Sequence, residues 1–298
     1  MNTFEVLGDP HLGRSFIAGV PLHRRGEREA SIWADFKTSL WNASKDFHIN
    51  MGDLFDKPYV SYDTISRAAD IYLDAAARRP KTTFVILRGN HDASRDMEKI
   101  SAFDIFHMIV AQTENIVVVV APIQIDEFQF YPWDPIRTST NMVIDAPCKA
   151  AFGHWDIDSY GGDDHNLVPL DLLQAESVYT GHIHKPEVRG KLTVVGSMQP
   201  LAHGEGDLYV TKTLDEVKLH PDAFKDKCLR VDLVPGEIFD IEVDCMQLTV
   251  RRGAEEETFD ACEVGAFDMM DLFKQAFTLE QVSEPIQSKV LERYAGLR

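Results

Sequence analysis

The sequence predicts an α/β fold in which two sheets pack face to face. Two observations lead to this prediction. Up to about residue 120, short apolar runs alternate with longer amphipathic stretches, and from Ile123 onward the runs become shorter and are separated by turns. Strands that alternate with helices pair in parallel through right-handed crossovers, which produces one sheet covered by helices. We expect the later, shorter strands to form a second sheet packed on the first.

The spacing of apolar residues places the individual elements. Intervals of three and four residues indicate helices, and short apolar runs bounded by turn residues indicate strands. The predicted helices span residues 27–45, 62–78 and 97–112, and the strands of the first sheet span residues 4–7, 47–50, 83–87 and 116–120. The second sheet is predicted to contain residues 124–131, 150–152, 178–180, 192–195, 208–212 and 216–219.

Shifts in composition divide the chain into three parts. Residues 1–220 are predicted to form the main two-sheet domain, and residues 221–253 a small cap module with strands at 229–234, 238–243 and 246–251. Residues 254–298 are predicted to form a C-terminal helical segment, with helices near 264–277 and 279–294. This segment carries more apolar side chains than a lone terminal helix needs, so we expect it to fold back on the cap module or to bind another protein.

Composition and charge limit the class of protein. The 298 residues are 44% apolar and 26% charged, which is typical of a globular protein with a buried core. The net charge of −18 is unusual for a protein that grips nucleic acid alone, because phosphate contacts need a basic surface. A nucleic-acid substrate would therefore require a local basic patch, bound metal or a partner protein.

The cellular compartment is also predicted from composition. The longest apolar run, residues 116–123, is too short to span a bilayer, and the first residues do not resemble a secretory signal, so we expect no membrane partner. The four cysteines lie far apart without paired spacing, which favours buried free thiols in a reducing compartment over disulfides or a zinc knuckle. A cytoplasmic location is the resulting expectation.

Five short polar motifs each follow a predicted strand directly. They are Asp9-Pro10-His11, Gly52-Asp53-Leu54-Phe55-Asp56, Gly89-Asn90-His91-Asp92, Gly153-His154 and Gly181-His182-Ile183-His184. Ligand sites of α/β folds lie at the carboxyl ends of strands, so we expect these motifs to meet at one edge of the molecule. Residues two apart in an extended chain project to the same side, and this spacing lets Asp9 with His11, and His182 with His184, face one pocket.

The donor types in these motifs indicate a metal site. Two Asp, one Asn and four His besides His91 provide mixed oxygen and nitrogen donors, which suit Mn²⁺, Fe²⁺ or Zn²⁺. The absence of thiolates argues against a structural zinc site. Seven ligands are too many for one ion, whereas they suit two ions about 3.5–4 Å apart that share a bridging carboxylate.

The five motifs, in this order, resemble those of the calcineurin-like metallophosphoesterase superfamily over about two thirds of the chain. Within that superfamily, residues 9–14, 52–56 and 196–201, with Gly204-Glu205 following, resemble the SbcD-type nucleases. These are bacterial and phage relatives of the double-strand-break repair nuclease. The resemblance implies a two-sheet α/β/β/α metallophosphoesterase sandwich with a small C-terminal cap and terminal helices.

The resemblance also implies roles for single residues. The first metal would be surrounded by Asp9, His11, Asp53 and His184, and the second by Asp53, Asn90, His154 and His182, with Asp53 as the bridge. The ions would be divalent, with manganese first and Fe, Zn or Mg as alternatives. His91 would be the catalytic histidine beside the leaving oxygen, and Asp92 would orient its imidazole. Some relatives have histidine where this chain has Asp56, which leaves open whether that position touches substrate.

The activity implied by the resemblance is a metal-dependent DNA exonuclease or endonuclease subunit in DNA repair, recombination or replication. Its partners would be DNA and an SbcC-type ATPase bound through the C-terminal helices, and a homodimer could form through helices 62–78 and 97–112. Arg14, Arg24 and Arg25 are candidate substrate contacts, since the basic stretch 23–28 follows the first metal motif. The alternative for this stretch is a solvated loop.

Two other functions remain open from the sequence. A phosphatase or a nucleotide or small-molecule phosphodiesterase would keep the chemistry and change the substrate, and the acidic charge favours it. A catalytically silent scaffold would keep only the fold, and the complete ligand set argues against that interpretation.

Overall fold

The computed structural model describes residues 2–94, 96, 99–161, 164–252, 277 and 282–295. By its internal contacts the chain divides into two units, Met1–Gly253 and Ala254–Arg298. Among the described residues, none of the helices combines the length and apolarity that a membrane crossing requires. Three of the four cysteines, Cys148, Cys228 and Cys245, are buried free thiols, and Cys262 lies outside the described residues.

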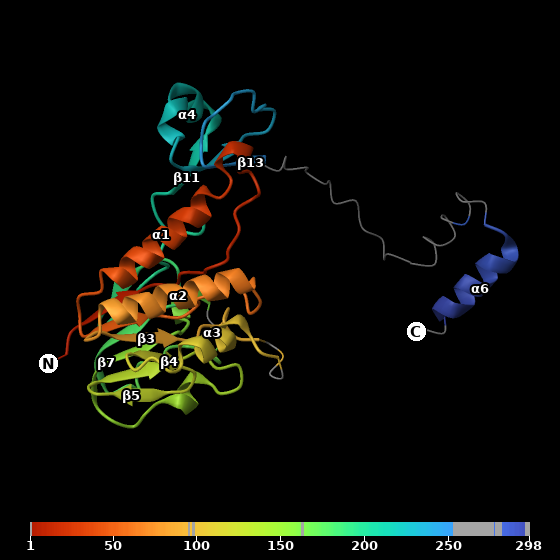
Figure 1. Cartoon of the computed structure of the whole chain (residues 1–298). Coiled ribbons are helices and arrows are strands. Elements are labelled where there is room, and N and C mark those ends of the chain that lie inside the picture. Colours follow the sequence, from red (N-terminus) through yellow and green to blue (C-terminus); the bar gives the residue numbers. More distant parts are fainter. Residues whose placement is uncertain are drawn as a thin grey trace. The chain divides into compact units, whose positions relative to one another are not determined.

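The first sheet consists of four parallel strands in sequential order. They are β1 (Phe4–Leu7), β2 (Phe47–Asn50), β3 (Thr83–Leu87) and β4 (Ile116–Val119). The connections contain the short 3-10 turn η1 (Leu22–Arg24) and the helices α1 (Glu27–Trp41), α2 (Tyr62–Arg78) and α3 (Ala102–Val110). Because right-handed crossovers that advance in one direction put every helix on the same face, these helices form a single layer (Figure 1). Phe36, Tyr72 and Phe106 from this layer pack in one core with Phe84 and Ile86 of β3.

The second sheet packs on the other face of the first. It has the order β5-β6-β7-β8-β10-β9 and contains β5 (Ile123–Ile125), β6 (Phe128–Tyr131), β7 (Cys148–Gly153), β8 (Ala175–Thr180), β9 (Glu187–Arg189) and β10 (Leu192–Val194). Ile49 and Val85 of the first sheet share a core with Phe128 and Phe152 of the second. The predicted fold of two packed sheets is therefore confirmed.

The outer face of the second sheet is covered by the segments on either side of β7, residues 139–147 and, as far as they are described, 154–161 and 164–173. In the described part of these segments, the covering layer consists of loops and the 3-10 turns η2 (Ser139–Met142) and η3 (Asp158–Tyr160). Trp155, Ile157 and Leu173 are buried there against Val178 of β8. The buried side chains therefore close this face of the sheet.

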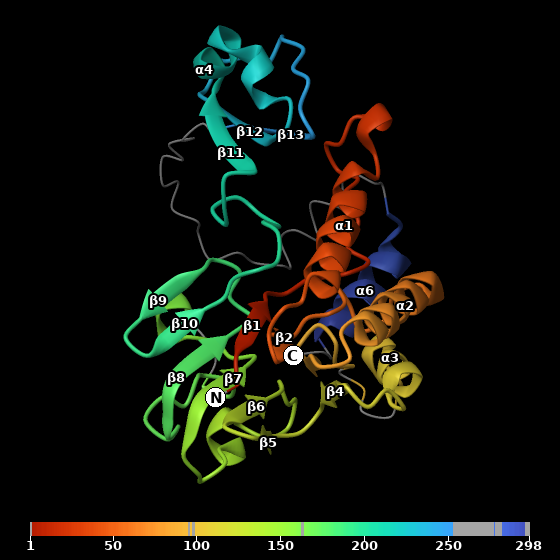
Figure 2. The same cartoon turned by 60° about the vertical axis from the view of Figure 1, so that its left-hand side comes forward.

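A third, smaller sheet of parallel strands completes the first unit. It contains β11 (Tyr209–Thr213), β12 (Cys228–Leu233) and β13 (Gln247–Arg252), and β11 is connected to β12 by α4 (Leu214–Leu219) and the 3-10 turn η4 (Pro221–Phe224). Figure 2 shows α4 beside these strands. The Leu248 N–H donates to the Gly19 carbonyl at 2.8 Å, which attaches β13 to the N-terminal segment that follows β1. In the second unit, the described helix is α6 (Glu284–Ala295).

Two predicted strands of the third sheet region are wrong. Residues 216–219 lie in α4, because Thr213 caps the helix and Glu216 completes a reciprocal capping box. Residues 238–243 form no strand, although Phe239, Ile241 and Val243 pack partly buried against the core of this sheet. The alternating apolar residues of this segment pack their side chains on one face, but the segment does not pair with a neighbouring strand.

Other boundaries differ in smaller ways. The predicted strand 208–212 belongs to the third sheet and not to the second, and 124–131 is a hairpin of β5 and β6 that turns at Asp126, where φ is 50°. The helix predicted at 97–112 begins only after Ser101, whose side chain caps α3. The helix expected near 264–277 lies outside the described residues, except for Phe277.

Candidate metal centre

Five loops bring the polar motifs to one place in the first unit. They follow the carboxyl ends of β1, β2, β3, β7 and β8, so both packed sheets contribute. The His11 N–H donates to the Asp53 carbonyl at 3.0 Å, and the His182 N–H donates to Asp9 Oδ2 at 2.8 Å. These bonds tie the loop after β1 to the loops of both sheets, as the order of the motifs predicted.

Two motif glycines allow the close approach of the ligands. A Cβ atom on Gly89 would lie 2.1 Å from Asp53 Oδ1, and one on Gly52 would lie 2.3 Å from His154 Nδ1. Gly52 also has a φ of 115°, a conformation that other residues rarely adopt. A side chain at either position would displace a candidate ligand.

Three of the candidate ligands have strained backbones. His11, Asp53 and His182 have φ values of 46°, 47° and 69°, in the left-handed region that is unfavourable for residues with a Cβ atom. Such strain costs on the order of 1–3 kcal/mol per residue and is concentrated at functional sites. The surrounding bonds hold these three side chains in conformations that an isolated loop would not keep.

Asp53 lies at the centre of the cluster. Its Oδ1 is 3.4 Å from His154 Nε2, and its Oδ2 is 3.6 Å from His11 Nε2. Oδ1 also accepts the His91 N–H at 2.9 Å. The two carboxylate oxygens thus face two different groups of donors, which is the arrangement of a bridging ligand.

The first group of donors contains Asp9, His11 and His184. Their ligand atoms lie within 4.8 Å of one another, and His11 Nε2 is 3.0 Å from His184 Nε2. Metal–nitrogen bonds of about 2.0–2.1 Å place two ligands of one ion at about this separation. Asp9 Oδ1 is buried without a hydrogen-bond partner. A buried oxygen without a partner beside two converging ring nitrogens fits a divalent cation.

The second group contains Asp53, His154 and His182, joined by Asn90. The three titratable residues again offer ligand atoms within 4.8 Å of one another. Asn90 Oδ1 lies 2.9 Å from His154 Nε2 and 2.8 Å from His182 Nδ1. The same atoms would surround an ion on the other side of Asp53.

Acceptors outside the cluster determine which nitrogen of each histidine faces inward. The His154 Nδ1–H donates to the Met51 carbonyl at 2.9 Å, so Nε2 is its inward donor. His184 Nδ1 is 3.2 Å from Glu205 Oε1, and His182 Nε2 is 2.8 Å from Asp156 Oδ1. Such partners fix the tautomer and the ring orientation of metal-binding histidines.

Sequence reasoning missed Asp156 and Glu205 as parts of this centre. Asp156 stands two residues after His154, a spacing that could have signalled a side chain on the same side of the chain. Glu205 follows His184 by 21 residues, and no local pattern connects the two. Only the fold brings that carboxylate to the histidine.

The charges in the cluster are those that a cation would match. Burial lowers the pKa of His11 to about 3, so its ring is neutral at physiological pH. Burial alone would raise the pKa of Asp53, but His154 and His11 hold it well below the usual range. Burial also lowers the pKa of His154, but the Asp53 carboxylate outweighs it and raises the value to about 10. The Asp53 carboxylate therefore favours positive charge in the place where His154 and Asp53 meet.

Comparison with known proteins agrees with this geometry. Residues 3–186 match the family model of the calcineurin-like phosphoesterases. The chain belongs to that family. No curated protein sequence matches this phosphoesterase significantly. Among solved structures, the nuclease MPE of Pseudomonas putida is similar, with 16% sequence identity and a TM-score of 0.30 over 65% of this chain and 73% of the other.

His91 lies beside both groups of donors in this phosphoesterase. Its ring centroid is 4.8 Å from that of His11, and its Nδ1 lies 2.7 Å from the Asp56 carbonyl oxygen. Because a carbonyl oxygen only accepts, Nδ1 carries the proton of that bond, and Nε2 is left for the substrate.

The expected orientation of His91 by Asp92 is corrected by these contacts. The Asp92 carboxylate accepts the backbone N–H groups of Leu54, Phe55 and Gly89 at 3.2, 2.9 and 2.9 Å. Asp92 is fully buried, and its pKa is raised by burial and by the charge of Asp53. It therefore holds the loops after β2 and β3 together, and the Asp56 carbonyl orients His91.

The three candidate substrate arginines lie in different environments. Arg14 is partly exposed, and its Nη1 is 3.5 Å from Asp56 Oδ1, next to the metal centre. Arg25 is exposed. Arg24 is buried and pairs with Glu27 at 3.0 Å, so the structure contradicts a role for it in substrate contact. Its other partners are Asp244, Asp226 and the Lys225 carbonyl, all in the third sheet region.

Proposed function

We propose that this phosphoesterase is a nuclease that hydrolyses DNA phosphodiester bonds with two divalent ions, manganese being the first candidate. The observation that carries the proposal is the position of His91. It stands beside His11 and Asp53, near enough to offer a nitrogen to the same centre, and the Asp56 carbonyl occupies its Nδ1, so Nε2 would serve a leaving oxygen. This combination serves in-line hydrolysis at a phosphorus atom.

The chain's own residues would divide the chemistry between them. Bound ions would neutralise the phosphate and activate a water molecule, with Asp9, His11, Asp53 and His184 around one and Asp53, Asn90, His154 and His182 around the other. His91, held by the Asp56 carbonyl, would protonate the departing oxygen or stabilise its charge. Asp156 and Glu205 would fix the ring orientations of His182 and His184.

A cavity beside His91 supports a nucleic-acid substrate. It has a volume of about 540 Å³ and is lined by Asn90 and His91 together with Tyr59, Lys99 and Trp133. Aromatic side chains such as Tyr59 and Trp133 stack on bases. Lys99 is paired with Asp96 of the same lining at 3.1 Å, so the aromatic rings are the main support. A phosphate group alone would leave most of this space unfilled, so the cavity favours a substrate with a bulky group beside the phosphate.

The acidic charge favours a second protein in the complex. A chain with a net charge of −18 repels DNA beyond its local patches, and an ATPase partner of the SbcC type would supply the grip. Residues 254–298 are our candidate docking segment for that partner, supported by the exposed Ile286 on α6 and by the apolar residues of the sequence. The exposed Met108 and Ile109 on α3 are the candidate face for a homodimer. The buried free thiols agree with a cytoplasmic location.

The proposal is tested by cleavage with the purified full-length chain. Single-stranded DNA, double-stranded DNA and bis-p-nitrophenyl phosphate are each incubated with Mn²⁺, alongside a His91→Ala variant. We expect DNA cleavage that falls by about 10²- to 10⁴-fold in the variant while bound manganese, measured by elemental analysis, stays the same. Equal cleavage by the variant would overturn the role of His91.

The same experiment separates the nuclease from its closest competitor. Hydrolysis of the small diester without any cleavage of DNA would favour a phosphatase or a small-molecule phosphodiesterase of the same family. Absence of metal binding and of all hydrolysis would favour the silent scaffold.

A further inference from the structure

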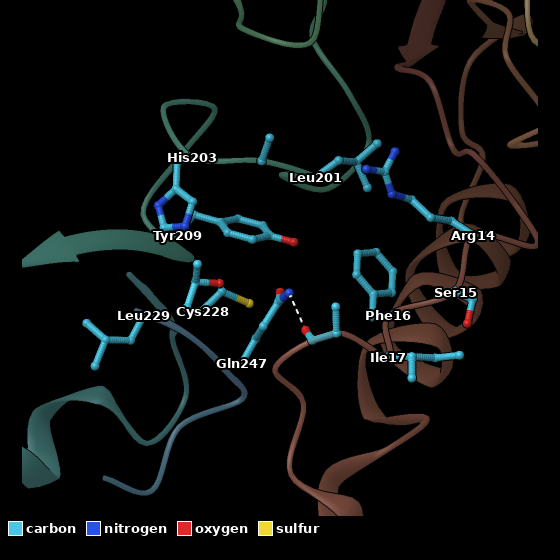
Figure 3. A pocket seen from close by; sticks show the side chains of 13 residues that line it. Arg14, Ser15, Phe16, Ile17, Leu201, His203, Tyr209, Cys228, Leu229 and Gln247 are labelled. Carbon is cyan, nitrogen blue, oxygen red and sulfur yellow. Dashed lines mark hydrogen bonds between the residues drawn. The ribbon is translucent and has the colours of Figure 1, made fainter. Parts of the chain in front are cut away.

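A second cavity, of about 310 Å³, lies between the segment after β1 and the third sheet. Figure 3 shows its two walls, with Arg14 and Phe16 from the N-terminal segment on one side and His203 and Tyr209 on the other. The Tyr209 ring extends from β11 toward Phe16 across the space between the walls. Apart from Arg14, the family resemblance gives none of these side chains a role.

The cavity has a positive lining in an acidic protein. Acidic residues outnumber basic ones by 48 to 30 in the chain, yet the described residues that line this space include Arg14 and no carboxylate. The acids next to the lining are Asp56, 3.5 Å from Arg14 Nη1, and Glu29, which accepts the Phe16 N–H at 2.8 Å. Behind the lining, the Arg28 guanidinium lies 5.0 Å from the Phe16 ring centroid and 5.9 Å from that of Tyr209. The local field therefore favours an anionic ligand.

Arg28 strengthens this field because its partners are neutral. It is 4% exposed, and it donates to Gln199 Oε1 at 2.7 Å and to the Pro200 carbonyl at 2.8 Å. Within the part of the chain that the structure describes, no carboxylate lies within 4.0 Å of it, and its Nε has no hydrogen-bond partner. Through the Gln199 amide, Arg28 is also connected to the Asp35 carboxylate.

The remaining lining suits a flat aromatic group. The rings of Phe16, Tyr209 and His203 border the space, and the His203 and Tyr209 centroids are 5.2 Å apart. Gln247 Nε2 donates to the Ala18 carbonyl at 2.8 Å across the cavity (Figure 3), which leaves its Oε1 and the Thr249 hydroxyl as groups that can hydrogen-bond to a base edge. The volume is at the lower end of the range of about 300–1,000 Å³ for ligand pockets, so it suits a single nucleotide.

Two chains of contacts connect this cavity to the metal centre. Arg14 Nη1 is 3.5 Å from Asp56 Oδ1, which is 3.7 Å from His11 Nδ1. On the opposite wall, Glu205 accepts the Leu201 N–H at 2.6 Å through Oε2 and contacts His184 Nδ1 at 3.2 Å through Oε1. Both walls are thus attached to ligands of the first metal, and a group bound between them would be positioned relative to the reacting phosphate.

We propose that this cavity binds one nucleotide of the substrate strand, with its base against Tyr209 and Phe16 and a phosphate on Arg14. Stacking on aromatic rings accepts any base, so the cavity would fix the strand without reading its sequence. The guanidinium of Arg14 provides paired donors for phosphate oxygens. This assignment rests on the proposed nuclease function.

Direct binding to the full-length, metal-free chain tests the assignment without relying on cleavage. In EDTA, the chain is titrated calorimetrically with dAMP, deoxyribose 5-phosphate and deoxyadenosine. We expect dAMP to bind most tightly. Tyr209→Ala should weaken dAMP binding by about 5- to 100-fold, and Tyr209→Phe should retain most of it. Arg14→Gln should weaken dAMP binding and leave deoxyadenosine binding unchanged.

Matched variants show whether these losses belong to the cavity. Tyr62→Ala and Arg78→Gln alter exposed side chains of α2 and should bind dAMP like the wild type. Far-ultraviolet circular dichroism checks that each variant is folded. Equal dAMP affinity in the wild type, the folded Tyr209→Ala variant and the folded Arg14→Gln variant would overturn the nucleotide site.

A kinetic arm distinguishes a nucleotide of the substrate strand from a free nucleotide. KM is measured for a short single-stranded oligonucleotide and for versions with an abasic residue at the 5′ or the 3′ end. One abasic version should have a higher KM with the wild type, and this difference should vanish in Tyr209→Ala. If dAMP binds, but KM is the same for the intact and both abasic oligonucleotides and does not change in Tyr209→Ala, the assignment to the substrate strand is wrong. If no oligonucleotide is cleaved, the proposed function fails, and the dAMP titrations still decide whether the cavity takes a nucleotide.

Discussion

At the scale of single residues, the metal centre depends on side chains that never face the substrate. Each inward nitrogen of His154, His182 and His184 is determined by an acceptor on the far side of its ring. Glu205 has a double task, because it also accepts the Leu201 N–H. Removing its charge should therefore affect metal affinity more than it affects the fold.

The variant Glu205→Gln tests this role. Glutamine keeps an acceptor for the Leu201 N–H but cannot stabilise the His184 imidazole as a carboxylate does. We expect the affinity for Mn²⁺ to fall by about 10- to 100-fold, as is typical for partners of metal-binding histidines. Calorimetric titration of the metal-free chain measures it, with the exposed Glu114→Gln as control. A purely structural role would lower the melting temperature of the metal-free chain and leave the affinity unchanged.

A buried histidine away from the metal centre predicts how stability depends on pH. His48 is 2% exposed on β2, its Nε2 is 3.0 Å from Ser39 Oγ, and burial lowers its pKa to about 4. The unfolded chain binds the proton near pH 6.5, so between pH 6.5 and about 4 it holds more protons than the folded chain. The stability contributed by neutral His48 is complete above pH 6.5 and is lost as the pH falls toward 4.

Replacing His48 with glutamine should remove this dependence, since the amide does not titrate. Urea unfolding of the metal-free chain at pH 7 and at pH 4.5 measures the effect. The wild type should lose roughly 2–3 kcal/mol more of its free energy of unfolding between these pH values than His48→Gln does. If the free energy of unfolding falls by the same amount in the wild type and in His48→Gln between pH 7 and pH 4.5, then other titrating groups dominate the loss of stability in acid.

The residue scale also shows which parts of the site could be predicted from sequence. Motifs at strand ends predicted which side chains gather in the candidate metal centre, because parallel topology brings those ends together. The role of Arg24 could not be predicted, since its partners Asp226 and Asp244 are about 200 residues away in the chain. The sequence alone does not show whether an arginine in a basic stretch is exposed to solvent or paired with an acid far along the chain.

At the scale of elements, the apolar pattern of residues 216–219 predicted a strand, whereas the capping residues before them predict the helix that the structure shows. The alternation of Val217 and Leu219 suggested a strand, but the capping box of Thr213 and Glu216 starts a helix there. Parallel pairing in the first sheet was predicted because strands that alternate with helices are joined by right-handed crossovers. Strand 208–212 was placed in the wrong sheet because its partner β12 comes after a helix and a 3-10 turn.

Gly89, the first residue of the third motif, allows a test of how tightly the candidate ligands are packed. In Gly89→Ala, the new Cβ atom would meet Asp53 Oδ1 at 2.1 Å, so the bridging carboxylate must move. We expect the variant to fold but to lose at least one bound manganese per chain, counted by elemental analysis after dialysis. Activity should fall with the metal content.

A second glycine, Gly190, serves as a control that separates the effect of a crowded side chain from the effect of backbone strain. Gly190 has a φ of 58°, and a Cβ atom added there would meet no other atom within 4 Å, so Gly190→Ala introduces strain without displacing a ligand. It should cost about 1–2 kcal/mol of stability and keep both ions. Equal metal content in the Gly89 and Gly190 variants would contradict the crowding at Asp53.

At the scale of the whole molecule, the distribution of charge limits where the proposed nuclease would contact DNA. Acids exceed bases by 48 to 30 in the chain, whereas the described residues that line the cavity at Arg14 include no carboxylate. Arg24 and Arg25 are adjacent in sequence but differ in their surroundings. Arg24 links the N-terminal segment to the third sheet through Glu27 and Asp244, and Arg25 is exposed.

These two arginines should separate stability from DNA binding. Arg24→Gln breaks contacts with two segments, so we expect it to lower the free energy of unfolding by roughly 2 kcal/mol and to leave the salt dependence of DNA binding unchanged. Arg25→Gln should leave stability unchanged, weaken DNA binding and reduce the slope of log affinity against log salt by about 1, as for the loss of one phosphate contact. Urea unfolding and fluorescence anisotropy at several salt concentrations measure both quantities. If Arg24→Gln changes the salt slope and Arg25→Gln does not, the buried guanidinium reaches DNA after all; if neither does, the loop is only solvated and the grip must come from Arg14 and a partner.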